Sequence, residues 1–491
     1  MPSNSYDLVV LGDDLAALVC ATLCARRGLR TLVLGDDRPA RYLLGPHKLP
    51  VEPMMWPGLP GSAAERILKE LHAELALRRK LREPKLSAQL VCPDLRVDLG
   101  AERLAAELER ELGATAGNGF EEPLAFWTRA ADVARTFDPL VTADHAYPGV
   151  GFFEKREVAK LVERATAEAD AWRGTVPSGG VPFIHLAAIL ARHPSPSAIA
   201  EARALDQWRA GPSPLRGDGE AVREILVEKL TTAGGEVRAG RVAELGVSWG
   251  KLSSLTLANG DDIGCGQIVA SRTPAELAAL LGKKAPKRLS ELSAEVSLVG
   301  YRYTLNVVLD EAGVPEHMAP TVAVIAAADA DPTGDAAFTI HLGEPDDAGR
   351  VVATIAAVLP ADGPLDADRI GPRCMALRAG LWRRLADVMP FFERHLVLAH
   401  SPFEATPPQV PGGRGSYDVP RNLPLTPPPI WRGSTGYLTG LKNLTLVGDQ
   451  VIPDMGIEGA LTSGWSAAKI ACAIAGKKKD YLRDEVVGAA S

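Results

Sequence analysis

The chain has 491 residues, 46% of them hydrophobic and 23% charged, which is typical of a folded protein with room for two or three domains. Its formal net charge of −7 argues against nucleic acid as the main partner. No run of apolar residues is long enough to predict a membrane-spanning helix, and the first residues lack the pattern of a secretory signal. We therefore expect a cytoplasmic protein.

The N-terminal residues have the pattern of a dinucleotide-binding βαβ unit. Residues 7–12 and 30–34 are predicted as buried strands, and residues 15–27 as the helix between them. The loop before the helix normally carries three glycines, which allow a tight turn, contact of the backbone with pyrophosphate, and close packing of helix on strand. At those positions this chain has Gly12, Asp14 and Ala17.

Asp14 is the departure with the largest expected effect. Its carboxylate would meet each negative charge of a diphosphate with roughly 4 kcal/mol of repulsion at about 4 Å, and Asp13 would add to it. The acid that normally binds the ribose falls on Gly35, although Asp36 and Asp37 follow and could take over that role with a small shift of register. By itself the segment predicts a Rossmann-shaped unit that either binds a nucleotide or only packs.

Two later segments contain elements of the same kind. Residues 218–232 are predicted as an amphipathic helix, and short strands follow up to residue 270, with a hairpin at Asn259 and Gly260. Residues 444–447 are predicted as a strand that leads into Gly448 and Asp449, and a glycine-rich helix begins at residue 456. The free N–H groups and dipole of such a helix start stabilise negative charge on a ligand.

In this order the three segments resemble the FAD-dependent amine oxidase and phytoene desaturase superfamily, and residues 84–112, 215–270 and 412–464 are closest to its phytoene desaturase branch. The resemblance implies an α/β fold with a Rossmann-type FAD-binding domain assembled from discontinuous segments. It also implies an α+β substrate domain with a mixed sheet and helices. The expected FAD-binding pieces are residues 1–60, 205–281 and 435–476, those of the substrate domain are 61–204 and 282–434, and 477–491 form a tail.

The resemblance also implies the positions of a flavin site. It puts Asp449 on the ribityl chain and the helix start at Gly456 beneath the flavin pyrimidine. It puts Val242 where the backbone meets adenine, and it leaves Arg41 as a candidate phosphate partner because the superfamily's Gly-Gly-Arg is absent. The candidate cofactor-binding residues are Gly12, Asp14, Ala17, Asp36, Arg41, Val242, Gly448, Asp449, Gly456, Ile457, Gly459 and Ala460.

Two classes of function remain open. The resemblance implies an FAD-dependent oxidoreductase that desaturates, saturates or isomerises a small apolar substrate, such as an isoprenoid or polyene. The alternative is a cofactor-free protein that keeps the scaffold and binds a lipid or a protein partner. A peripheral membrane contact is left open, and so is the oligomeric state.

The sequence identifies no catalytic side chain, because in such enzymes the flavin carries the hydride and the protein supplies the pocket. Glu458, at the predicted helix start, is the one carboxylate worth testing, and stabilisation of that helix is its simpler role. The six cysteines and nine histidines show no metal-binding spacing, so no metal site is expected.

Overall fold

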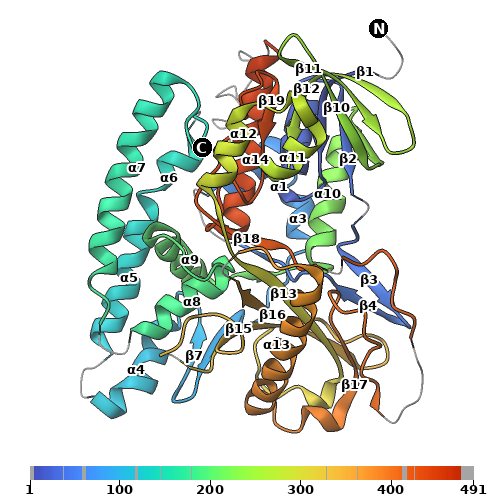
Figure 1. The fold of residues 1–491 in the computed structure, drawn as a ribbon. Helices are drawn as coiled ribbons and strands as arrows, with labels where there is room; N and C mark the ends of the chain where they lie inside the picture. The colour runs from blue at the N-terminus through green and yellow to red at the C-terminus, as the bar shows by residue number, and fades with distance from the viewer. Residues whose placement is uncertain are drawn as a thin grey trace.

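The computed structural model of the chain is shown in Figure 1. It describes residues 5–476 apart from 37, 58–61, 117–119, 144, 178–179, 328, 362, 412–416 and 425. The predicted tail, 477–491, therefore lies outside the described residues.

Strands from the N-terminal, central and C-terminal parts of the chain form one sheet. β1 pairs in parallel with β2 on one side and with β12 on the other, and β12 also pairs in parallel with β19. The predicted convergence of the three segments is therefore confirmed. The strands of this sheet are β1 (Ser5–Leu11), β2 (Thr31–Gly35), β9 (Glu236–Ala239), β10 (Val242–Ser248), β11 (Lys251–Leu257), β12 (Asp262–Ala270) and β19 (Leu444–Leu446).

Three helices pack beside this sheet. α1 (Leu15–Arg26) lies between α10 (Asp218–Thr232) and α14 (Gly456–Ile474) and contacts both. The contact with α14 is close, since a Cβ at Gly464 would lie 2.4 Å from the backbone oxygen of Ala16. Glycine at this position therefore lets α14 pack directly on the helix that follows the first loop.

A second, mixed sheet lies below the first in Figure 1 and carries α13 (Ala367–Val388). β14 pairs in parallel with β6, while its other neighbour, β15, is antiparallel. This confirms the mixed sheet predicted for the later part of the chain. Its strands are β6 (Ala88–Cys92), β7 (Leu95–Leu99), β13 (Ser297–Asp310), β14 (Thr321–Ile325), β15 (Ala337–Leu342), β16 (Arg350–Pro360), β17 (Leu396–His400) and β18 (Pro429–Arg432).

A group of helices stands to one side of both sheets (Figure 1). These helices share a continuous apolar core with the first sheet, and Trp127 and Trp172 are fully buried in it. The apolar spacing of residues 63–82 predicts one long helix, but the structure has two short ones, α2 (Ala63–Leu71) and α3 (Glu74–Arg78), because His72 has a left-handed backbone (φ 49°) between them. These two contact the helices beside the first sheet, α2 with α1 and α14 and α3 with α10. The helices of the group at the side are α4 (Leu104–Ala116), α5 (Glu121–Arg135), α6 (Asp138–Thr142), α7 (Phe152–Arg173), α8 (Val181–Ala191) and α9 (Ala198–Ala210).

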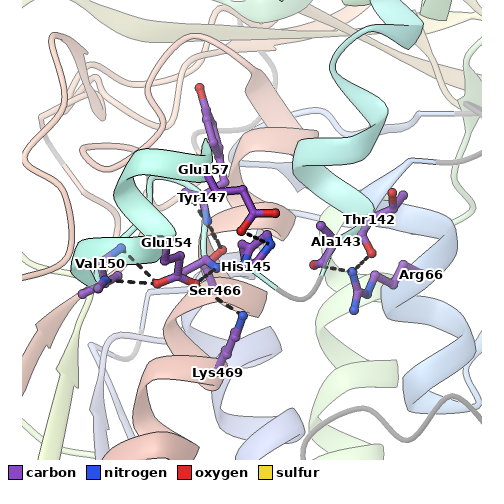
Figure 2. Close-up of polar contacts among 12 residues, drawn as sticks. Arg66, Thr142, Ala143, His145, Tyr147, Val150, Glu154, Glu157, Ser466 and Lys469 are labelled. Atoms are coloured by element: carbon purple, nitrogen blue, oxygen red, sulfur yellow. Dashed lines mark hydrogen bonds and ion pairs between the residues drawn. The ribbon is translucent and has the colours of Figure 1, made fainter. Parts of the chain in front are cut away.

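The start of α7 is fastened to α14, as Figure 2 shows. Glu154 accepts hydrogen bonds from the backbone N–H groups of Ala146, Val150 and Gly151, and the ammonium of Lys469 on α14 lies 3.4 Å from it. Burial raises the pKa of Glu154, but these hydrogen bonds outweigh it and hold the pKa below its ordinary value. Glu154 thus links the start of α7 to α14 in the C-terminal segment.

None of the helices in the described ranges combines the length and apolar character that crossing a bilayer requires.

A buried carboxylate on α9 leads to a prediction about pH. The side chain of Glu201 is 7% exposed, and burial raises its pKa to about 7 although Arg173 lies 2.5 Å away. Between the ordinary pKa of 4.5 and about 7, the folded protein holds a proton that the unfolded chain has released. We therefore expect the free energy of unfolding to fall as the pH rises through this window, by roughly 3 kcal/mol.

The measurement is the denaturant midpoint at about pH 5 and about pH 8 in the parent and in Glu201→Gln. The parent should lose clearly more stability between the two conditions than the variant. An equal loss in both proteins would show that Glu201 does not titrate in this range.

Candidate functional site

Among the cavities lined by described residues, two neighbours lie where β1, β2, β12 and β19 end. The residues that line the outer cavity, of about 340 Å³, include Gly12, Asp13, Asp14, Asp36, Arg38, Arg223, Ser271 and Arg272. The residues that line the inner cavity, of about 380 Å³, include Glu52, Met54, Met55, Ile189, Leu190, Arg192, Asp449, Gly456 and Ala460. Because the two share lining residues, they adjoin, and we call the two cavities together the groove. The shared residues are Asp14, Leu15, Arg38, Glu52, Pro53, Met54 and Pro428.

Ser271, directly after β12, is where the first and last loops meet. Gly12 has φ +112°, and a Cβ there would lie 3.0 Å from the Cβ of Ser271. Gly448 has φ +107°, and a Cβ there would lie 2.9 Å from the Oγ of Ser271. Both positions need glycine for the backbone angle and for space. The predicted turn role of Gly12 fits this geometry.

Asp13 fills the space that a side chain at position 35 would take. A Cβ on Gly35 would lie 2.7 Å from Oδ2 of Asp13, so any larger residue there would collide with the carboxylate. Arg223 on α10 lies 2.9 Å from the same oxygen and neutralises it. The acid missing at the end of β2 is thus replaced by a carboxylate from the neighbouring loop. From the sequence, Asp13 is expected only to add to the electrostatic repulsion of a diphosphate.

Asp14 caps α1. Its Oδ1 accepts a hydrogen bond of 3.1 Å from the backbone N–H of Ala17 and so uses one of the free donors at the helix start. Burial raises the pKa of Asp14, although hydrogen bonds from Ser271 and Ala17 act in the opposite direction. The carboxylate lines both cavities. The side chain therefore lies at the helix start, where the sequence predicts that it would meet a diphosphate.

The other two aspartates of the predicted site are each held by an arginine. Asp36 lines the outer cavity and is bound through both oxygens by Arg272, which lowers its pKa despite burial. Asp449 lines the inner cavity and accepts a hydrogen bond from Nη2 of Arg302 on β13. These two carboxylates, like that of Asp13, therefore have counter-charges built into the fold.

The start of α14 forms one wall of the inner cavity. Gly456, Ile457 and Ala460 line it, as predicted from the glycine-rich sequence. Gly459 faces the preceding loop instead, since a Cβ there would lie 2.9 Å from the backbone oxygen of Ile452. The sequence thus predicts the position of this wall, but it does not predict that Gly459 packs away from the cavity.

Glu458 is bound by Arg203 and is not free to act as a base. Arg203 donates from Nε at 2.7 Å and from Nη2 at 2.5 Å, and both side chains are almost fully buried. Arg203 also contacts Asp138 at 2.9 Å. This network ties α14 to α9 and α6, so the geometry fits the structural role expected for Glu458.

Besides Gly448 and Gly459, three predicted residues line neither cavity. Ala17 is fully buried in α1. Val242 is half-buried on β10 and lines neither cavity. Arg41 donates to the backbone oxygen of Lys48 at 2.8 Å and lines a separate cavity with Asp218. Arg38, three residues earlier, lines both parts of the groove instead, because the loop turns before β3 (Arg41–Leu44) begins.

Sequence reasoning missed the arginines that surround the groove. Arg223 comes from α10, Arg272 follows β12, Arg192 ends α8 and Arg302 lies on β13. Each is remote in sequence from the aspartate or glutamate that it contacts, so no local motif marks it. Only the order in which the strands assemble brings them together.

Comparison with known proteins gives the fold. The chain resembles the structure of an oxidoreductase from Methanosarcina mazei, with a TM-score of 0.60, 12% identity, and coverage of 94% of this chain and 99% of that one. It also resembles cyclohexylamine oxidase from Brevibacterium oxydans IH-35A, with a TM-score of 0.55, 13% identity, and coverage of 96% and 99%. The chain thus has the fold of the amine oxidases, which confirms the predicted fold class.

The same fold is found in a protein that is not named as an oxidoreductase. A Rab GDI from Plasmodium falciparum matches with a TM-score of 0.54 and 10% identity over 95% of this chain and 98% of that one. No protein-family model matches the sequence. No curated protein matches it either.

The buried pair of Arg203 and Glu458 gives a prediction. Glu458→Ala leaves the guanidinium without its main partner and should lower the free energy of unfolding by roughly 3 to 5 kcal/mol. The double variant Arg203→Met with Glu458→Leu should recover most of that loss, since it removes both charges. Denaturant unfolding measures both effects. If Glu458→Ala unfolds like the parent, the carboxylate has a role other than holding Arg203.

Proposed function

We propose that this protein is an FAD-dependent oxidoreductase whose cofactor lies along the groove. The observation that carries the proposal is that the outer and inner cavities adjoin each other. Together they join the loop after β1 to the start of α14 at the carboxyl ends of the parallel strands. In open α/β sheets this edge is where dinucleotides bind. The likeness of the fold to those of named oxidases supports the same conclusion.

The order of the residues along the groove matches the order of the chemical groups in FAD. In the outer cavity, Asp13 offers a carboxylate beside Gly35, where a ribose hydroxyl needs an acceptor. In the inner cavity, Asp449 suits the ribityl chain, and the N–H groups at Gly456 suit the negative charge of the flavin pyrimidine. FAD, when bound, supplies the acceptor for a hydride. The chain itself orients the reactants and excludes water.

Asp14 is the residue that opposes this assignment. Burial, Asp449 and Asp13 raise the pKa of its carboxyl group, and the guanidinium groups of Arg272 and Arg302 lie within its electrostatic reach. A useful flavin affinity corresponds to about −8 to −12 kcal/mol. A penalty of a few kcal/mol at one end of the groove would weaken such binding without abolishing it.

The proposed substrate is a small, largely apolar molecule that undergoes desaturation, saturation or isomerisation. Met54, Met55, Ile189, Leu190 and Ile457 give the inner cavity its apolar walls. Phe, Tyr and Trp are absent from its described lining, which argues against an aromatic cage for an amine. Charged side chains also line the cavity, so it is less apolar than we expected from the sequence.

The alternative is a cofactor-free protein that binds a lipid or a protein partner. Two observations favour it: Asp14 occupies the start of α1, and Arg302 already binds Asp449. The likeness to a Rab GDI is compatible with it. Flavin binding decides between the two functions.

Moving the carboxylate from position 13 to position 35 tests whether Asp13 binds the ribose of FAD. Asp13→Gly should weaken FAD binding by about tenfold or more, because a ribose hydroxyl loses its charged acceptor at a cost of roughly 1.5 to 3 kcal/mol. Asp13→Gly with Gly35→Asp should restore it, since the carboxylate returns from the neighbouring strand. Equilibrium titration followed by flavin fluorescence measures both affinities.

Gly35→Asp alone is the matched control. Because the new side chain would collide with Asp13, this variant should bind FAD less well than the double variant and be less stable than the parent. A double variant that binds no better than Asp13→Gly would show that Asp13 does not serve the ribose.

A second pair of variants tests the two ends of the groove. Asp14→Gly should tighten FAD binding by up to a few kcal/mol, because it removes a negative charge beside the diphosphate. Asp449→Ala should lose flavin and activity together, at a cost of about 1.5 to 3 kcal/mol for the charge-assisted bond. In the cofactor-free alternative, neither change would alter any flavin signal.

A further inference from the structure

The inner cavity contains two guanidinium groups with unused hydrogen-bond donors. Nη2 of Arg192 and Nε of Arg302 are both buried, and neither has a hydrogen-bond partner within the described part of the chain. Arg192 ends α8 and Arg302 lies on β13, and both line the cavity. Donors buried without a partner are costly in folded proteins. Each side chain nevertheless keeps exposed surface, 19% for Arg192 and 23% for Arg302, through which a ligand in the cavity can contact it.

The nearest carboxylate does not satisfy these donors. Glu52 lies between the two arginines, with Oε2 3.7 Å from Nη1 of Arg192 and Oε1 3.6 Å from Nε of Arg302. Both distances are too long for a hydrogen bond, and Oε1 of Glu52 lacks a partner among the described residues. One carboxylate is thus shared loosely by two cations.

The other ionisable groups of the inner cavity are already engaged or neutral. Asp449 accepts from Nη2 of Arg302, and Asp454 accepts from the backbone N–H of Ser197 at 2.9 Å. Glu458 and Arg203 satisfy each other. His341 is neutral, since burial and the nearby Arg192 lower its pKa to about 3. Asp14 caps α1, and Arg38, whose side chain is 66% exposed, lies 3.9 Å from Asp36. Arg192 and Arg302 are therefore the less exposed cations left to meet a charged ligand.

We infer that the inner cavity binds the anionic end of the substrate, a carboxylate or a phosphate, through the guanidinium groups of Arg192 and Arg302. Guanidinium groups suit both anions because their planar N–H donors match pairs of oxygens. The apolar side chains of Met55, Ile189 and Leu190 line the rest of the cavity. The ligand class is an apolar molecule with one anionic group. Calling it the substrate rests on the proposed function, but the binding site itself does not.

The test uses probes of matched apolar length: octanoate, octyl phosphate and 1-octanol. Calorimetric titration of the parent protein should give at least tenfold tighter binding for one of the two anions than for the alcohol, and the preferred anion identifies the group. Arg192→Met should bring that anion to the level of 1-octanol and leave 1-octanol unchanged. Arg209→Met is the control, because Arg209 pairs with Asp206 on the same helix and does not line the cavity.

Equal binding of octanoate, octyl phosphate and 1-octanol to the parent would overturn the inference. So would an unchanged preference for an anion in Arg192→Met. Arg192→Gln serves as the second variant if Arg192→Met does not fold, and the same loss of preference is expected.

The flavin content of each sample, read from its visible absorbance, separates this inference from the proposed function. A protein that binds no flavin but still prefers an anion would contradict the proposed function alone. A protein that loses its preference for an anion once FAD is bound would show that these donors serve the cofactor, which would overturn the substrate assignment.

Discussion

The close approach of two loops at Ser271 is the constraint on which the groove depends. Gly12 and Gly448 both adopt backbone angles that favour glycine, and a methyl group on either would press against Ser271. This contact holds the ends of β1, β12 and β19 at one edge of the sheet. With those ends fixed, α1 and α14 start beside each other, and the outer and inner cavities adjoin.

Charge balance in the groove is a second consequence of the fold. The three aspartates 13, 36 and 449 are paired with Arg223, Arg272 and Arg302, and each pair joins two distant parts of the chain. The pair of Asp449 and Arg302 links the C-terminal loop of the first sheet to β13 of the second. A carboxylate that looks unfavourable in the sequence is therefore balanced by a residue that only the tertiary structure brings near. Asp14 lacks such a direct pair among the described contacts and caps a helix instead.

How much could be predicted from the sequence depended on how local each signal was. The strand and turn around Gly448, the helix that begins at Gly456 and the hairpin at Asn259 follow from adjacent residues, and the structure has them where expected. The break at His72 gave no such signal, since a left-handed histidine has no distinct sequence pattern. The contact between Asp13 and Gly35 could not be predicted either. In the sequence the two residues are separate departures from the usual motif, and only the structure shows that the aspartate fills the space beside the glycine.

The measurement that tests the account most directly is the visible absorption spectrum of the purified protein after incubation with excess FAD and removal of the unbound cofactor. If the groove binds FAD as proposed, the protein should retain a flavin spectrum at close to one cofactor per chain. A protein without visible absorbance after this treatment would contradict the proposed function and favour the cofactor-free alternative.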